Sequence, residues 1–239
     1  MRIRYDLHIH SCLSPCGDDE LTPATVAGMA KLCGLDACAL TDHNSAKNCP
    51  AFFKAAAFYG VAPLGGLELS TVEGVHVLCL FDTLEKTMDF DRFVYSRLLR
   101  TENRPDFFGE QLVRDEEDAI LAREPYLLSG DTDIPFSEAL GHAKRYGGVA
   151  LPAHIDRQAN GAVAVFGTVP PEGGFTSFEL RDRDNLNAYK IYLPADDPVI
   201  LFDSDAHRAE DIGAAGGTMH LPDGISPAEI PREILRTLL

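Results

Sequence analysis

The chain has 239 residues, a length at which a single α/β domain with a sizeable buried core is the default expectation. Lys and Arg total 21 against 37 Asp and Glu, and this formal charge of −16 argues against a long nucleic-acid duplex as partner, because a duplex needs a basic stripe. No apolar run approaches the ~20 residues of a membrane helix and the first residues lack a signal-peptide pattern, so we expect a cytoplasmic protein without a membrane partner.

The first apolar run, 5–11, reads Tyr-Asp-Leu-His-Ile-His-Ser. A strand points alternate side chains to opposite faces, so a strand here would place Asp6, His8 and His10 on one side. Two imidazoles spaced by one residue, beside an aspartate, are typical of metal ligands oriented by a hydrogen-bonded carboxylate. If a metal binds there, further His, Asp and Glu side chains should follow other predicted strands.

Repeated strand and helix patterns follow this run. Thr22 is placed to cap a helix with Pro23 in its first turn and Gly34 at its end. A strand at 36–40 then leads to an Ala-rich helical stretch that runs to about residue 60. These patterns predict consecutive βα units.

A hairpin is expected next, because the apolar runs 61–69 and 75–81 are separated by too few residues for a parallel crossover. Antiparallel pairing of these runs would bring Glu68 opposite His76 to within one register step. The departure from βα order therefore joins two candidate ligands.

Residues 84–147 are predicted to form a mostly helical insertion without a catalytic signature, and its final helix spans about 135–146. Three further strands are expected at 149–153, 175–180 and 198–202. The sequence from Ser226 to Glu229 has a capping-box pattern and predicts a terminal helix, whose start Pro231 delays.

Most of the predicted strands end in His, Asp or Glu. The candidate ligands are His8, His10, Asp18, His43, Glu68, His76, His154, Asp205 and His207. A metal centre takes ~4 to 6 ligands, so this set implies two or three divalent transition ions, Zn, Mn or Fe, with Glu68 placed to bridge. The other two histidines, His142 and His220, are interpreted as structural. Cys12 and Cys16 lack the second half of a zinc ribbon and are interpreted as loop or core thiols; the six cysteines are expected to be reduced.

The collected motifs resemble the PHP (polymerase and histidinol phosphatase) domain superfamily of metal-dependent phosphoesterases. The matching segments are 6–11 (Asp-Leu-His-Ile-His-Ser), 41–44 (Thr-Asp-His-Asn), Glu68 with His76, 152–154 (Pro-Ala-His) and 204–207 (Ser-Asp-Ala-His). They cover nearly the whole chain in the family's order, and together they are highly specific. The resemblance implies a distorted seven-stranded (β/α) barrel, a single domain over 1–239, with a trinuclear centre at the C-terminal ends of the strands.

The resemblance also implies which residues hold each ion. The first ion would take His8, His10, Glu68 and Asp205, the second Glu68, His76 and His154, and the third Asp18, His43 and His207. Asp18 is placed by its spacing to the segment 21–23, and Asp19 is an immediate rival.

The chemistry expected of such a centre is hydrolysis of a phosphate ester by a metal-bridging hydroxide, since coordination lowers the pKa of bound water from ~16 toward ~7. His207, Asp205 or a bound water would protonate the leaving group. Arg157, three residues after His154, is the leading candidate for a bidentate phosphate contact, ahead of Lys47 and Arg181.

Three functions fit the sequence. The first is a phosphoesterase acting on a phosphate monoester or diester of a small molecule, a nucleotide or a short oligonucleotide. The second is a processive nuclease or proofreading exonuclease, which the acidic balance disfavours. The third is a non-catalytic metal-binding regulatory module, which the complete ligand set disfavours.

Overall fold

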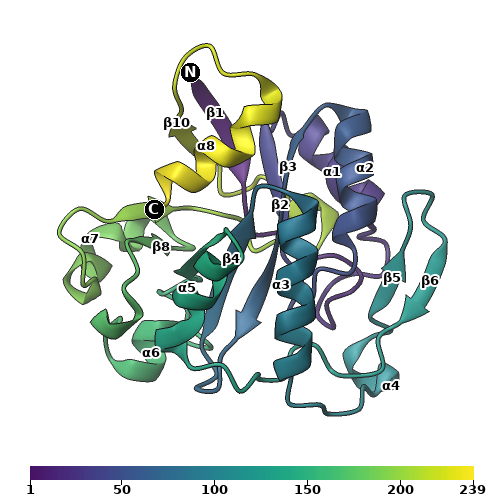
Figure 1. Cartoon of the computed structure of the whole chain (residues 1–239), viewed down its shortest axis with the longest axis horizontal. Helices are drawn as coiled ribbons and strands as arrows, with labels where there is room; N and C mark the ends of the chain where they lie inside the picture. The colour runs from purple at the N-terminus through teal and green to yellow at the C-terminus, as the bar shows by residue number, and fades with distance from the viewer.

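The computed structural model describes the whole chain, Met1–Leu239, as a curled mixed sheet with helices packed around it (Figure 1). The sheet has six strands in the order β10-β1-β2-β3-β4-β7. Their bounds are β1 (Arg2–Asp6), β2 (Ala37–Leu40), β3 (Ala62–Ser70), β4 (His76–Phe81), β7 (Val149–Pro152) and β10 (Gly217–His220). β1, β2 and β3 are parallel, whereas β4 is antiparallel to β3 and β7, and β10 is antiparallel to β1.

Four other strands form two small sheets. β8 (Ser177–Glu179) and β9 (Val199–Leu201) are parallel, and β5 (Leu112–Arg114) and β6 (Ile120–Arg123) form an antiparallel hairpin. The seven-stranded barrel expected from the sequence therefore differs from the structure, whose continuous sheet holds six strands and leaves β8 and β9 outside it. A parallel bridge between Ile9 and Ala206 joins the segments that follow β1 and β9.

Helices surround the sheet. Their bounds are α1 (Pro23–Leu32), α2 (Cys49–Tyr59), α3 (Leu84–Arg97), α4 (Pro105–Phe108), α5 (Phe136–Arg145), α6 (Ala162–Phe166), α7 (Leu186–Tyr189) and α8 (Ile230–Thr237). Short 3-10 turns lie at η1 (Pro171–Gly173), η2 (Arg183–Asn185), η3 (Lys190–Tyr192), η4 (Ala209–Asp211) and η5 (Pro227–Glu229). The expected caps form, since the Thr22 side chain accepts from the Thr25 amide and Ser226 and Glu229 complete a capping box.

Both faces of the sheet are buried, which alternate residues of β2 illustrate. Ala37 and Ala39 belong to a core cluster of 40 buried residues, to which α3, α5 and α8 contribute. Cys38 and Leu40 belong to a second cluster of 16 residues, which α1 and α2 cover. Double coverage keeps the middle of the sheet dry and fixes the strand ends that carry the site.

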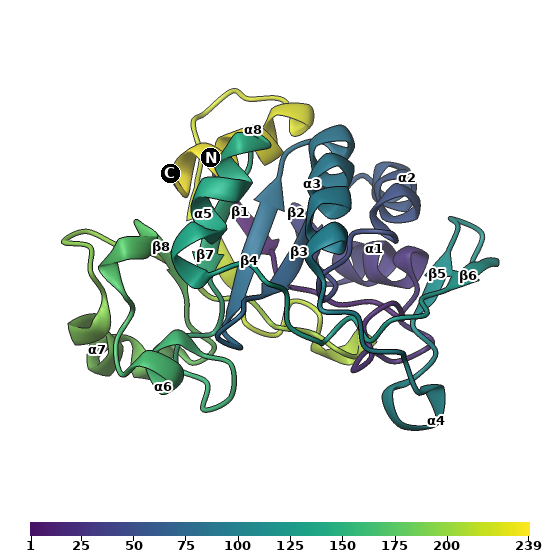
Figure 2. The same cartoon turned by 60° about the horizontal axis from the view of Figure 1, so that its bottom comes forward.

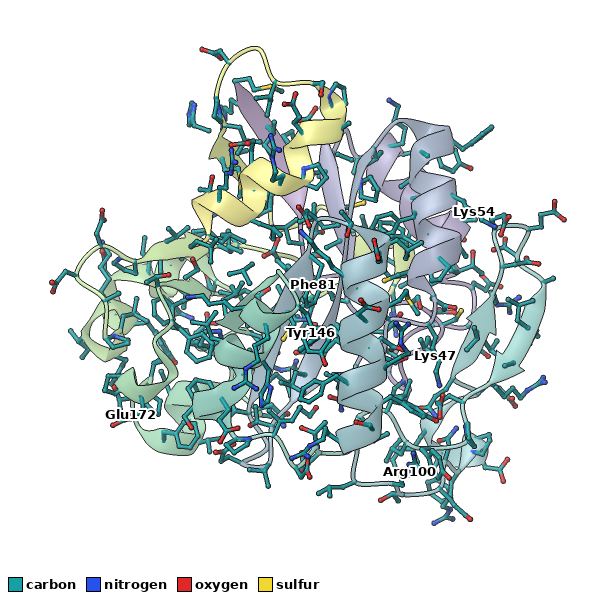
Figure 3. The ribbon with its side chains drawn as sticks, in the orientation of Figure 1. Lys47, Lys54, Phe81, Arg100, Tyr146 and Glu172 are labelled. Carbon is teal, nitrogen blue, oxygen red and sulfur yellow. The ribbon has the colours of Figure 1, made fainter.

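An aromatic group joins two helices of the predicted insertion to the sheet. The Phe90 ring lies 5.0 Å from Phe81 and 5.6 Å from Tyr146 between centroids. Figure 3 shows Phe81 and Tyr146 between α3 and α5. These helices are therefore part of the main core, and they frame one side of the sheet.

The rest of the predicted insertion extends from this core. α4 and the β5–β6 hairpin stand away from the sheet in Figure 2, where the lower edge of Figure 1 comes forward. None of the helices combines the length and the apolar character needed to cross a bilayer.

Candidate metal centre

The predicted ligands gather where the strands end, although the first strand is shorter than expected. β1 stops at Asp6, so His8 and His10 lie beyond the strand, with ring centroids 5.2 Å apart. The strand ends there because side chains take over the backbone donors: the Leu7 amide donates to Asp203 Oδ1 at 2.6 Å and the Ile9 amide to Thr41 Oγ1 at 3.1 Å.

Glu68 is the centre of the group. Its Oε1 atom lies 2.7 Å from His76 Nδ1 and 2.8 Å from His154 Nε2. Its Oε2 atom lies 3.0 Å from His43 Nδ1 and 3.4 Å from His10 Nε2. Burial raises the pKa of Glu68, but the charges of His76 and His43 outweigh it and hold this pKa well below its usual range. Glu68 is thus an ionised carboxylate facing imidazoles from several strand ends.

Asp205 completes a second face of the group. Its Oδ1 atom lies 3.3 Å from His10 Nε2 and 3.5 Å from His8 Nε2, and Arg157 Nη1 donates to its Oδ2 at 3.1 Å. Asp205 has φ 51° and His154 has φ 28°, a region that side chains rarely adopt. Such backbone strain is typical of functional positions, where the surrounding fold holds the residue in place.

Three groups of potential ligand atoms, each within 4.8 Å, result from this convergence. They are His8 with His10, Glu68 and Asp205; His43 with Glu68 and His76; and His10 with Cys16, His43 and His207. His154 reaches the same place through its contact with Glu68.

The donor atoms in these groups fit metal ions. Buried polar atoms of these groups without a hydrogen-bond partner include His8 Nε2, His10 Nε2, His43 Nδ1 and Asp205 Oδ1. An unsatisfied buried group costs about 1–3 kcal/mol, so their accumulation at one place is expensive unless a ligand satisfies them. Imidazole nitrogens and carboxylate oxygens are ligands that divalent transition ions accept.

Glu179, which the sequence reasoning did not select, fixes the orientation of two ligands. One oxygen lies 2.9 Å from His8 Nδ1 and the other accepts the His154 amide at 2.7 Å. Because the carboxylate accepts, His8 Nδ1 carries the proton and Nε2 keeps a free lone pair facing the site. Glu179 ends a predicted strand, so the rule that selected Glu68 could have found it.

A second support runs from His10 through Ser14 to Asp42. The Ser14 hydroxyl donates to Asp42 Oδ1 at 2.6 Å and therefore accepts from His10 Nδ1 at 2.9 Å. Asp42 also accepts the Ser11 amide at 2.7 Å. His10 is thereby held in the tautomer that leaves Nε2 free, as in His8.

The environment separates the protonation states of the imidazoles. Burial lowers the pKa of His10, but the neighbouring carboxylates of Asp205 and Glu68 outweigh it and raise this pKa to about 9. Burial also lowers the pKa of His43, but the charge of Glu68 outweighs it and raises this pKa to about 9. Burial and then the charge of His10 lower the pKa of His207 to about 3. His207 Nδ1 lies 2.7 Å from the Asp205 carbonyl, to which it donates, so Nε2 is free.

The structure does not bring Asp18 into any of the three groups. Asp18 is exposed and its Oδ1 accepts from the Glu20 amide at 3.0 Å, and its rival Asp19 is exposed as well. Cys16, interpreted from the sequence as a loop or core thiol, lies instead among His10, His43 and His207.

Two cavities open beside the ligands and share Arg157, Cys16 and His207. One has a volume of about 560 Å³ and is also lined by Arg181. The second cavity has a volume of about 380 Å³, and its further lining residues include His43, His76, Phe107 and Phe108. A substrate can therefore approach both the imidazoles and the Arg157 guanidinium.

Other residues considered from the sequence lie outside this group. Lys47 forms an ion pair with Glu124 and lies 3.8 Å above the Tyr95 ring, between α3 and the β5–β6 hairpin in Figure 3. His142 packs on Phe93 with a centroid distance of 4.7 Å, and His220 in β10 pairs with Arg2 of β1. Their partners account for them structurally.

Comparison with known proteins gives both a family and similar folds. The PHP domain family profile matches residues 6–145, more than half of the chain. No curated protein shows a sequence match to the chain. Two structures of endonuclease Q, one of them the lesion-specific endonuclease from Pyrococcus furiosus, superpose over 100% of this chain with TM-scores of 0.68 and 0.67 at 19% identity. This chain spans only 56% of theirs.

Two other solved structures match most of both chains. A protein assigned as a metal-dependent phosphoesterase from Bifidobacterium adolescentis has a TM-score of 0.57 at 18% identity, over 86% of this chain and 88% of its own. An amidohydrolase from Chromobacterium violaceum has a TM-score of 0.60 at 20% identity, over 98% of this chain and 95% of its own. At these identities the similarities concern the fold.

The α/β fold and the family match together define the class of the protein, an α/β domain of PHP type. Its clustered His, Glu and Asp side chains could hold divalent metal ions. The chain belongs to the PHP domain family.

Proposed function

We propose that residues 1–239 act as one phosphoesterase domain that hydrolyses a phosphate monoester or diester of a small molecule or nucleotide. The observation that carries the proposal is the convergence of unpartnered imidazole and carboxylate atoms from separate strand ends beside an open cavity. Two or three ions of Zn, Mn or Fe would be held there. Their proposed ligands are His8, His10, His43, Glu68, His76, His154, Asp205 and His207.

Bound divalent ions would supply an ionised water as nucleophile and would neutralise charge on the phosphoryl oxygens. The chain's own residues orient these components. Glu68 and Asp205 remain ionised and act as ligands, and Arg157 lies at the cavity wall where its guanidinium can leave Asp205 to bind a phosphoryl oxygen. His207 is neutral near pH 7 because its pKa is about 3, so we assign it to ligation and the leaving-group proton to solvent.

The cavity beside His43 and His76 favours a substrate with an aromatic group. Phe107 and Phe108 of α4 line it, and they are 72% and 40% exposed. Exposed aromatic rings beside a reaction centre can stack on a nucleobase or an aryl leaving group, a contact worth about 1–3 kcal/mol per base. This part of the predicted insertion at 84–147 would therefore bind the substrate.

Hydrolysis assays test the proposal directly. Metal-loaded protein should hydrolyse p-nitrophenyl phosphate, its bis ester or members of a nucleotide panel, and a chelator should remove turnover until metal is restored. Replacing Phe107 and Phe108 by Ala should raise KM for nucleotides, whereas Phe58→Ala on α2, where the side chain is 84% exposed, should not. Absence of turnover on every substrate with full metal occupancy would overturn the proposal and favour a regulatory metal-binding module.

A nucleic-acid phosphodiester is the second candidate substrate. Its support is the fold shared with endonuclease Q, of which one structure holds a 27-mer duplex with an abasic lesion at the active site. Two observations argue against duplex binding by this chain. Its net charge is −16, and it spans only 56% of the enzyme that binds the duplex. Cleavage of a lesion-containing duplex at physiological salt, faster than cleavage of nucleotides, would favour this candidate.

A further inference from the structure

Cys16 occupies the place expected of a carboxylate ligand. Its sulfur and the ligand nitrogens of His10, His43 and His207 all lie within 4.8 Å of one another. Asp18, two residues later, is exposed and hydrogen-bonded to the Glu20 amide. We propose that Cys16, as a thiolate, binds a divalent transition ion together with His43 and His207, and that Asp18 does not. The inference rests on the proposed metal centre.

The imidazoles of this cluster point to a ligand independently of the cysteine. His10 Nε2 and His43 Nδ1 have no hydrogen-bond partner, and the two residues are only 0% and 6% exposed. His207 donates through Nδ1 to the Asp205 carbonyl, which leaves Nε2 as its free ligand atom. Buried nitrogens without hydrogen-bond partners thus belong to a group whose potential ligand atoms lie close enough together for one cation to bind.

The loop before α1 determines which side chain faces this point. The Ser14 amide donates to the Ser11 carbonyl and the Gly17 amide to the Ser14 carbonyl, both at 3.0 Å. The Asp18 amide then donates to the His207 carbonyl at 3.1 Å, so the loop is tied by its backbone to the site. Gly17 is required for this path, because a Cβ there would lie 2.1 Å from the Ser11 oxygen. Consecutive turns thus place Cys16 against the imidazoles.

The accessibility of Cys16 suits a ligand exchange with solvent. It is exposed and lines both cavities, whereas Cys33 is partly buried and the other four cysteines are buried. On binding, the thiol proton leaves to solvent and a sulfur lone pair forms the bond to the ion. A soft sulfur donor beside imidazoles favours Zn²⁺ or Fe²⁺ over Mn²⁺ at this position, while the carboxylate-containing groups accept all three.

Cobalt substitution tests the assignment without measuring activity. Metal-free full-length protein titrated with Co²⁺ should develop a thiolate-to-cobalt charge-transfer absorption in the near ultraviolet. The absorption should disappear in Cys16→Ser and persist in Asp18→Asn and in the matched control Cys33→Ser, whose thiol contacts the Ile212 carbonyl at 3.3 Å. Elemental analysis of the Zn²⁺-loaded proteins should find one ion fewer in Cys16→Ser than in the wild type.

Alkylation provides a second measurement. Iodoacetamide should modify Cys16 in the metal-free protein, bound Zn²⁺ should protect it, and Cys33 should react equally in both states. Retention of all ions by Cys16→Ser together with loss of one by Asp18→Asn would overturn the assignment and leave the phosphoesterase proposal intact. Failure of wild-type protein to retain any ion would overturn both.

Discussion

Replacing Glu179 by Gln is a sharp test of how the ligands are oriented. Glu179 is 1% exposed and its two oxygens accept from two donors, His8 Nδ1 at 2.9 Å and the His154 amide at 2.7 Å. Gln offers one accepting oxygen and one NH₂ group, so only one of these donors keeps its partner. If the oxygen stays with His154, His8 must take the other tautomer, in which Nε2 carries the proton and cannot bind a metal.

The cost of Glu179→Gln can be stated as an affinity. Loss of a hydrogen-bonded support behind a metal ligand typically lowers metal affinity 10–100-fold, about 1.4–2.7 kcal/mol. Competition with a chromogenic chelator measures this change in the metal-loaded protein. Glu172→Gln is the matched control, because Glu172 is exposed on η1, at the outer edge of the molecule in Figure 3, and belongs to none of the ligand groups. If Glu179→Gln binds metal with the same affinity as the wild type, Glu179 does not orient His8 and His154 for metal binding.

Three further predictions concern the substrate, pH and the core. Arg157→Lys removes the planar fork that can bind a phosphoryl group, and should cost about 1.5–3 kcal/mol in kcat/KM, while metal content measured by elemental analysis stays unchanged. Without metal, His10 and His43 have pKa values of about 9 against an ordinary 6.5. Their protonation therefore stabilises the folded protein fully below about pH 6.5, and this stabilisation is lost as pH rises through 9. Thermal melts should show the fall in stability, and metal loading should abolish it. Phe90→Ala empties a fully buried site and should lower the free energy of unfolding by about 3–5 kcal/mol in urea titrations; a cost below about 1 kcal/mol would contradict the described packing.

Local sequence patterns were sufficient to predict much of the ligand group. Parallel strands end at one edge of a sheet, so His43 and Glu68 could be expected to meet from their positions after β2 and near the end of β3. A parallel bridge joins these two residues. The short connection between β3 and β4 similarly predicted that His76 returns to this edge. The expected register was wrong, because Glu68 pairs with Leu78 and His76 pairs with Ser70, two residues away.

The position of Cys16, rather than Asp18, beside His10, His43 and His207 could not be predicted from spacing. Both residues lie in one short loop, and the direction of each side chain depends on the successive turns through Ser11, Ser14 and Gly17. Residue preferences indicate that such a segment turns, but they do not indicate which residue faces inward.

The strand count depended on long-range pairing. β10 joins the sheet because Arg2 pairs with His220 at the other end of the chain, a contact that no local periodicity reports. The end of β1 at Asp6 has the same origin, since Asp203 takes the Leu7 amide from a distant segment. Local hydrophobic patterns therefore predict where strands lie better than they predict which strands pair in the sheet.

Anomalous diffraction from crystals grown with Zn²⁺ and measured on both sides of the zinc edge would show whether metal ions bind around Glu68. We expect two or three zinc peaks within bonding distance of Glu68 and the surrounding imidazoles, with His8 bound through Nε2. An ordered site without any anomalous peak at full zinc concentration, or peaks only at surface carboxylates away from Glu68, would contradict this expectation.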